Sequence, residues 1–509
     1  MAYNTNVYFI VFLPLAMLVY QLTPKKYRWI SLLASSVVFF GLISKYLILW
    51  AILTTALTYA GGVLIGRHGN EPQAGKRILW YSLVPVLGIL VGLKYTNFTI
   101  EIINRVVASA GMTGTIPLLN ILVPIGISFY TLQAIGYLLD VYWKRIAPEQ
   151  NYFRLLLFLI YFPTVMEGPI CRWTDVSEQL FQGEPIHQEN LTKGCIRIVW
   201  GLFKRMIIAD RLNVAVNALY GTNIYVGGAM VIVSMLITTI QLYMEFSGTI
   251  DIVIGSSRIF NIVLPENFRQ PFLAKSASEF WRRWHISLGT WFKNYIFYPV
   301  TTSPLMKKWN KFGRKHAGKY ITTVVTSAIA LFPVWMLNGL WHGPKFPYIM
   351  YGVYYFIVLL LEVMLEPAGK AFWEKLHCKE EGFVVSAVRM VRTWGIVLVG
   401  EMLFRAQNIG QFFPLMKRIF SAIQVGGGLG ASMMEIGMDI GDYAVVVLGC
   451  VIAFGVEIIL EKQPDFLERL PEWSTPKRWL VYYSVIMAII VFGAYGDGYQ
   501  PADLIYAGF

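Results

Sequence analysis

The stretch that decides the fold is "KYITTVVTSAIALFPVWMLNGLWHGPK", residues 319–345. Between its two terminal lysines it contains no Asp, Glu, Lys or Arg. A helix needs roughly 20 mainly apolar residues to cross a bilayer, so this run is long enough to span one. A second run without these charged residues lies between Arg211 and Glu245. Both runs predict membrane-spanning helices.

The composition of the whole chain supports the same class. Of its 509 residues, 56% are hydrophobic and 14% are charged, whereas a soluble domain is about 25% charged. We therefore predict an all-α polytopic membrane protein, residues 1–509 forming one membrane domain, with about 10 to 13 transmembrane or half-membrane helices. The expected spans lie near residues 7–22, 28–43, 46–66, 78–96, 116–141, 152–170, 195–218, 226–246, 320–342, 347–366, 387–405, 442–461 and 479–496.

The basic residues predict the orientation of the chain. Residues 1–24 contain no Lys or Arg, and Lys25, Lys26 and Arg28 follow directly. Because cytoplasmic loops are enriched in Lys and Arg, we expect a multi-pass protein of the cytoplasmic membrane with its N-terminus outside. The net charge is +13, but it is spread over short clusters between apolar runs. This pattern indicates contact with anionic membrane lipids and no nucleic-acid partner.

Two segments interrupt the apolar pattern with proline and glycine. They are "PTVMEGPICRW" (163–173), which contains Glu167, and "LNGLWHGPKFP" (337–347), which contains His342. Proline and glycine end or bend helices. Irregular backbone at membrane depth is tolerated only against protein or a water-filled cavity, so both segments predict a protein interior.

His342 is the first candidate for chemistry. Apart from Tyr320 it is the only ionisable side chain in residues 320–344, and ionisable groups at such depth are commonly functional. An imidazole can take a proton from a hydroxyl and return it to a leaving group. The other interpretation is a buried histidine that is hydrogen-bonded to a backbone carbonyl.

His285 lies in "WRRWHISLGTWFKNYIFYPV", residues 281–300. Read as one helix, the stretch places His285 on the same apolar face as Trp281, Leu288 and Phe292. This predicts an amphipathic helix in the membrane interface. His285 is then either a second polar group of the site or a satisfied core residue.

Other polar residues favour structural roles. Asp251 and Arg258 are seven positions apart, which predicts an ion pair on one helical face. Gln133 and Tyr137 share a face and are expected to form interhelical hydrogen bonds. The four cysteines and six histidines show no metal-ligand spacing, so no metal is expected.

Several segments together resemble the membrane-bound O-acyltransferase family, in its bacterial branch of alginate O-acetylation and teichoic acid D-alanylation. They are "VPIGISFYTLQAIGYLLDVYW" (123–143), "FPTVMEGPICRW" (162–173), "MEFSGTIDIVIGSSRIFNIVLPENFRQPF" (244–272), "FWRRWHISLGTWFKNYIFYPV" (280–300) and "LNGLWHG" (337–343). The resemblance implies helices around a central funnel. It also implies that His342 is the catalytic histidine and that His285 is the family's second important position near the cavity.

The resemblance further implies transfer of an acyl group from a cytoplasmic thioester donor, acetyl-CoA or an acyl carrier protein, to an acceptor outside. We expect O-acetylation of an extracellular polysaccharide, no bound cofactor, and an extracytoplasmic partner of the SGNH esterase type. D-alanyl transfer onto teichoic acid and a non-enzymatic transporter are the alternatives. The expected substrate-binding residues are Trp341, Asn338, Trp284, Arg283, Gln133 and Glu167.

Overall fold

The computed structural model describes residues 3, 5–221, 227–379, 382–421 and 427–495. Throughout these residues the secondary structure is helical, with a single isolated β-bridge between Phe268 and Trp284. The described residues divide into two compact units, the first formed by those up to 198 together with 249–265, and the second by 199–248 together with those from 266 to 495. Two of the unit boundaries fall inside helices, α9 and α11, and a third lies in the loop after α11.

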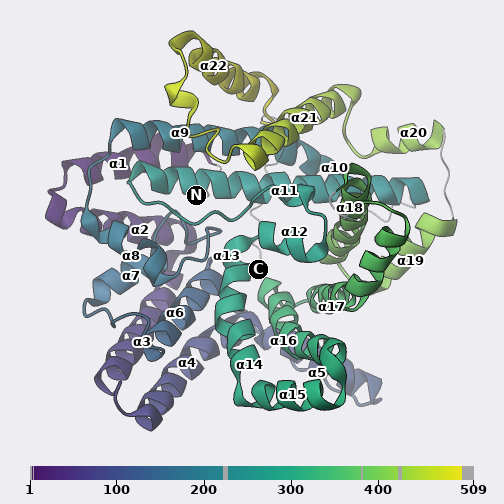
Figure 1. Ribbon diagram of the computed structural model, residues 1–509. Coiled ribbons are helices and arrows are strands. Elements are labelled where there is room, and N and C mark those ends of the chain that lie inside the picture. The colour runs from purple at the N-terminus through teal and green to yellow at the C-terminus, as the bar shows by residue number, and fades with distance from the viewer. Residues whose placement is uncertain (1–2, 4, 222–226, 380–381, 422–426, 496–509) are drawn as a thin grey trace. The chain divides into compact units, whose positions relative to one another are not determined.

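The first unit is built from the N-terminal helices (Figure 1). Within it α3 packs against both α4 and α6, and α2 packs against α7. Its elements are η1 (Val7–Phe12), α1 (Leu13–Leu22), η2 (Lys25–Tyr27), α2 (Arg28–Ser44), η3 (Lys45–Leu47), α3 (Ile48–Arg67), α4 (Pro72–Lys94), α5 (Thr96–Ser109), α6 (Ile127–Tyr142), α7 (Tyr152–Ile160), α8 (Trp173–Gln182) and the first part of α9 (Gln188–Phe203).

The second unit contains the remaining helices, except for the C-terminal part of α11, which belongs to the first unit. Its elements are η4 (Lys204–Ala209), α10 (Asp210–Gly221), α11 (Gly228–Ile259), η5 (Pro271–Leu273), α12 (Ala277–Arg283), α13 (Ile286–Phe292), η6 (Lys293–Phe297), α14 (Tyr298–Thr302), α15 (Pro304–His316), α16 (Gly318–His342), α17 (Phe346–Lys375), α18 (Phe383–Arg405), α19 (Ile409–Ser421), α20 (Gly427–Glu435), α21 (Ile440–Lys462), η7 (Leu470–Glu472) and α22 (Thr475–Phe492).

The prediction of a polytopic membrane protein is confirmed. Seven helical segments of the described chain are long and apolar enough to cross a bilayer, and Val7–Leu22 is a shorter apolar helix. One of the seven, Lys25–Arg67, has 43 residues, about twice what a bilayer requires. It is interrupted at Lys45, whose φ of 50° is left-handed. The segment Lys25–Arg67 is therefore better described as two candidate spans, α2 and α3.

Several predicted boundaries are wrong. Residues 112–124 are not helical, so the expected span near 116–141 is reduced to α6. α7 ends at Ile160, and the segment from Tyr161 to Cys171 is buried irregular backbone, which agrees with the break expected around Glu167. The span expected near 226–246 continues to Ile259, giving a helix of 32 residues.

The helices α16 and α17 form the closest helix pair around His342. Gly339 of α16 and Gly352 of α17 face each other across the interface between these two helices. A Cβ on Gly339 would lie 2.4 Å from the carbonyl oxygen of Tyr348, and one on Gly352 would lie 2.4 Å from that of Trp335. Small residues allow helix backbones to approach this closely in a membrane. This contact fixes the end of α16 against the start of α17.

Candidate active site

His342 is the last residue of α16. The helix ends there because Gly343 has a φ of 154° and Pro344 follows it. The imidazole is 5% exposed, although the helix that carries it is largely exposed along its apolar length. The expected helix break beside a buried histidine is therefore present.

An aromatic cage of four rings surrounds His342. The His342 ring centroid lies 5.0 Å from that of Trp341, 5.8 Å from Tyr351, 5.0 Å from Phe404 and 6.3 Å from Tyr348. These rings come from α16, α17 and α18. A cage of this kind keeps bulk water away from the imidazole and strengthens electrostatic interactions with it.

His285 does not lie within a continuous amphipathic helix, so that prediction is wrong. α12 ends at Arg283, Trp284 forms the antiparallel bridge with Phe268, and α13 starts at Ile286. His285 itself has a φ of 47°, in the left-handed region. This backbone turn changes which face each residue occupies, because the periodicity of 3.6 residues does not continue through it.

The His285 side chain is buried, with 3% exposure. Its Nδ1 lies 3.3 Å from Oδ1 of Asn267, and its ring contacts Phe246 at a centroid distance of 5.0 Å. Burial lowers the pKa of His285 to about 3. The ring is therefore neutral at physiological pH and can act as a hydrogen-bonding group.

Trp341 brings the two histidines into one site. Its ring centroid is 5.6 Å from that of His285 and 5.0 Å from that of His342, with edge-to-face geometry in both pairs. Trp284, which directly precedes His285 in the chain, packs its ring against Tyr243, Phe268 and Phe280. The structure thus brings the two histidines and Trp341 together, and the substrate-binding roles expected for Trp341 and Trp284 stay predictions.

Asn338 and Glu401 add polar groups near His342. Asn338 is four residues before His342 on α16, so both project from the same face. Its side chain is buried, and its Oδ1 has no hydrogen-bonding partner in the described chain. The buried Glu401 carboxylate on α18 is hydrogen-bonded to Tyr351 of the cage. An acidic residue within an apolar span was an available signal for Glu401 that the sequence reasoning did not use.

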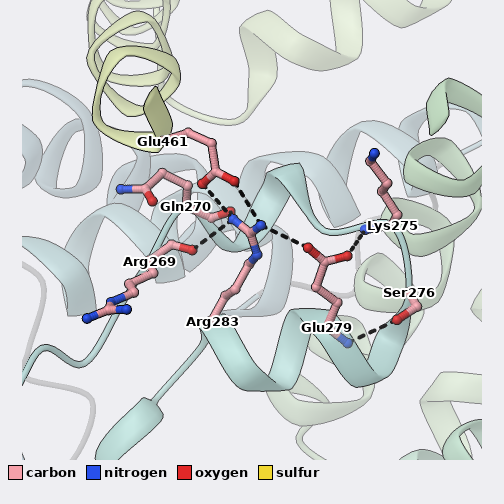
Figure 2. Close-up of polar contacts among 7 residues, drawn as sticks. All are labelled: Arg269, Gln270, Lys275, Ser276, Glu279, Arg283 and Glu461. Atoms are coloured by element: carbon pink, nitrogen blue, oxygen red, sulfur yellow. Dashed lines mark hydrogen bonds and ion pairs between the residues drawn. The ribbon is translucent and has the colours of Figure 1, made fainter. Parts of the chain in front are cut away.

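Arg283 is the centre of an ion cluster (Figure 2). Its guanidinium donates to both carboxylate oxygens of Glu461 at 2.7 and 2.9 Å, and it pairs with Glu279 at 2.8 Å. Further contacts reach the carbonyl oxygens of Arg269 and Gln270. Arg283 thus ties α12 to α21 and to the loop before η5, directly beside the turn at His285. Its expected role in substrate binding stays a prediction.

Gln133 and Glu167 belong to the first unit, whereas the histidines belong to the second. Gln133 is buried in α6, and Glu167 is fully buried in the irregular segment after α7. Tyr137, which shares a face with Gln133, accepts a hydrogen bond from the backbone N–H of Glu149 at 2.7 Å. The substrate contacts expected for Gln133 and Glu167 stay predictions.

The ion pair expected between Asp251 and Arg258 is wrong. Asp251 pairs with Arg197 of α9, whose Nε lies 2.5 Å from its Oδ1. In the second unit, Arg205 of η4 pairs with Glu245 of α11 at 2.8 Å, and neither side chain is exposed. The two acidic residues of α11 are therefore each paired with an arginine that precedes the helix in the chain.

Among the residues that the structure describes, no group of three or more His, Cys, Asp or Glu side chains is placed to hold a metal ion. The cysteines of this part of the chain are free thiols.

The profile of the membrane-bound O-acyltransferase family matches residues 146–380, which include both histidines. A protein of Pseudomonas aeruginosa named probable alginate O-acetylase is 32% identical over 83% of this chain and 75% of its own length. The chain belongs to the membrane-bound O-acyltransferase family. It is accordingly an acyltransferase, and this assigns a group-transfer reaction to the membrane domain.

Other relatives differ in how much of the chain they match. The peptidoglycan O-acetyltransferase of Helicobacter pylori is 27% identical over 82% of this chain and 79% of its own length. The teichoic acid D-alanyltransferase of Bacillus subtilis is 28% identical over 50% of this chain and 62% of its own length. The similarity to the two O-acetylating proteins therefore extends over considerably more of the chain.

Proposed function

We propose that this membrane-bound O-acyltransferase transfers an acetyl group from a cytoplasmic thioester donor to a hydroxyl of an extracellular polysaccharide. The observation that carries the proposal is the buried cluster in which Trp341 contacts both His285 and His342. The longer matches to alginate and peptidoglycan O-acetylating proteins favour acetyl over D-alanyl.

In the proposed reaction His342 is the general base. It takes the proton of the hydroxyl that first accepts the acyl group, on the partner protein or on the polysaccharide, while that oxygen attacks the thioester carbonyl, and it returns the proton to the departing thiolate. The new ester bond forms as the carbon–sulfur bond breaks. The aromatic cage limits hydrolysis by keeping water from the thioester. His285 serves as the second polar group, which orients the reacting substrate.

The same proposal places the parts of the system on the two sides of the membrane. The N-terminus is outside, the basic clusters face the cytoplasm, and acetyl-CoA or an acyl carrier protein supplies the acyl group there. A partner with an extracytoplasmic domain of the SGNH esterase type completes transfer to the polysaccharide. In this proposal residues 1–509 form one membrane domain, and the chain binds no cofactor of its own.

The test uses the full chain in lipid nanodiscs with two labelled donors, acetyl-CoA and a D-alanyl carrier protein. Loss of label from the thioester and its appearance in cell-envelope polysaccharide are followed. We expect His342→Ala to lower the rate by roughly 100-fold to 10,000-fold, as loss of a general base does. The matched control is His316→Ala, which changes an exposed histidine at the end of α15.

Transfer from acetyl-CoA that is lost in His342→Ala and kept in His316→Ala supports the proposal. Transfer only from the D-alanyl carrier overturns the choice of acyl group. Full activity of a folded His342→Ala variant overturns the assignment of the base.

A further inference from the structure

Asn267 makes hydrogen bonds that fix which way its side-chain amide points. The residue is fully buried. The backbone N–H of Ser287 lies 3.0 Å from the Asn267 Oδ1, and the Ser287 hydroxyl donates to the same atom at 2.9 Å. A backbone N–H can only donate, and of the two amide atoms only the oxygen can accept. The oxygen of Asn267 therefore faces α13.

This orientation determines the protonation of His285. The same Oδ1 lies 3.3 Å from Nδ1 of His285. Because the amide oxygen carries no hydrogen, Nδ1 must be the nitrogen that donates. In a neutral imidazole the lone pair is then on Nε2, since the hydrogen bond of one ring nitrogen sets the state of the other.

The backbone holds this pair rigidly. The N–H of Ile286 donates to the carbonyl oxygen of Asn267 at 3.0 Å, and the Phe268–Trp284 bridge lies immediately beside it. His285 adopts the left-handed conformation that the turn requires. Its ring is contacted by Phe246 of α11 and by Trp341 of α16, which is followed by the titratable His342. The imidazole therefore has a fixed position as well as a fixed tautomer.

We propose that Asn267 is a positioning residue that keeps His285 in the Nδ1–H tautomer, so that Nε2 is the nitrogen that accepts a hydrogen bond from the substrate. This inference rests on the proposed function, in which His285 acts on the reacting groups. Asn267 has the role that carboxylates or carbonyls have behind metal-bound or catalytic histidines, but as an uncharged acceptor. An uncharged acceptor leaves the buried imidazole neutral.

The first test reads the tautomer directly and needs no variant of Asn267. Nitrogen-15 NMR of the full chain with labelled histidine in nanodiscs distinguishes a protonated ring nitrogen from one with a lone pair. The signals of His285 are identified as those lost in His285→Gln. The expected result is a neutral ring protonated at Nδ1, and a ring protonated at Nε2 overturns the proposal.

The second test compares three variants in the acetyl-CoA transfer assay. Asn267→Leu removes the acceptor and is expected to lower kcat by roughly 10-fold to 100-fold, as loss of a supporting hydrogen bond does. Asn267→Asp keeps the acceptor and restores much of kcat. Its carboxylate favours the charged imidazole, so the acidic limb of the pH–rate profile moves to higher pH. Ser287→Ala removes the hydroxyl hydrogen bond but keeps the backbone N–H of residue 287 on the Asn267 Oδ1, so its effect on kcat is expected to be well below that of Asn267→Leu.

The outcomes separate this inference from the proposed function. If His285→Gln keeps full transfer, the role of His285 in the proposed function fails, while the NMR signals still report its tautomer. If His285 is required but Asn267→Leu and Ser287→Ala have equal effects, the positioning role of Asn267 is overturned. A shifted pH profile in Asn267→Asp supports it, because a purely structural role would not move that profile.

Discussion

The fully buried pair of Arg205 and Glu245 makes a strong prediction about stability. The two side chains have no exposed surface and their charged atoms are 2.8 Å apart. Glu245→Gln keeps the shape of the side chain and removes its charge. Removing one partner of a buried ion pair typically costs about 3 to 5 kcal/mol, because it leaves the other charge uncompensated. Asp210 stays 3.7 Å from Arg205, so we expect a loss near the lower limit, about 3 kcal/mol.

The chain offers a matched control for this variant. Lys370 and Glu366 are also 2.8 Å apart, but their side chains are 51% and 62% exposed. Exposed helical pairs of this kind contribute only about 0.3 to 0.5 kcal/mol. Glu366→Gln thus makes the same chemical change at the same distance, in a pair that is largely exposed and whose cation is a lysine.

The assay is the free energy of unfolding in mixed micelles, followed by tryptophan fluorescence as denaturing detergent is added. A third protein, Arg205→Met with Glu245→Leu, removes both charges and should recover part of the loss, because Asp210 then loses the cation that lies 3.7 Å from it. Equal losses in Glu245→Gln and Glu366→Gln would refute the reasoning. So would a double variant whose loss equals or exceeds that of Glu245→Gln.

Three further predictions concern the site and its supports. Gly339→Ala should lower both the transfer activity and the free energy of unfolding, because its Cβ would meet the Tyr348 carbonyl. The loss of unfolding free energy should be about 1 to 3 kcal/mol. Gly395→Ala is the control and should lower neither, because its Cβ would have no other atom within 4 Å. Burial lowers the pKa of His285 to about 3, so its contribution to stability is complete above the unfolded-state pKa near 6.5 and is lost as pH falls toward 3. The free energy of unfolding, measured from pH 7 to pH 4, should therefore depend less on pH in His285→Leu than in the unchanged protein. An equal dependence on pH in the two proteins would contradict this. Arg283→Lys cannot keep both bonds to Glu461, which should lower the thermal midpoint; an unchanged midpoint would show that this cluster adds little.

The long apolar runs made the helices predictable, and local irregularities explain the errors. The run containing His342 ends where Gly343 and Pro344 end α16, as its composition predicted. Residues 112–124 are apolar as well, yet they are not helical. Hydropathy measures how well a segment tolerates lipid, and it does not specify the backbone conformation that the segment adopts.

The site was only partly predictable because its geometry depends on contacts distant in sequence. His342 and Trp341 are adjacent in the chain, but the contact between Trp341 and His285 joins positions 56 residues apart. The left-handed turn at His285 is stabilised by Asn267, and no rule of periodicity indicates it. Likewise the acidic Asp251 could have paired on its own helix, and its true partner, Arg197, is on another.

The order of residues along the polypeptide also bears on how α11 can be made. Most of its apolar length, 72%, is covered by protein, and it carries two acids whose partners, Arg197 and Arg205, are translated first. Both arginines are therefore synthesised before α11 emerges from the ribosome. In a circular permutant opened between residues 210 and 227, α11 would be synthesised before Arg197 and Arg205. Its two carboxylates would then enter the membrane insertion machinery before their cationic partners exist.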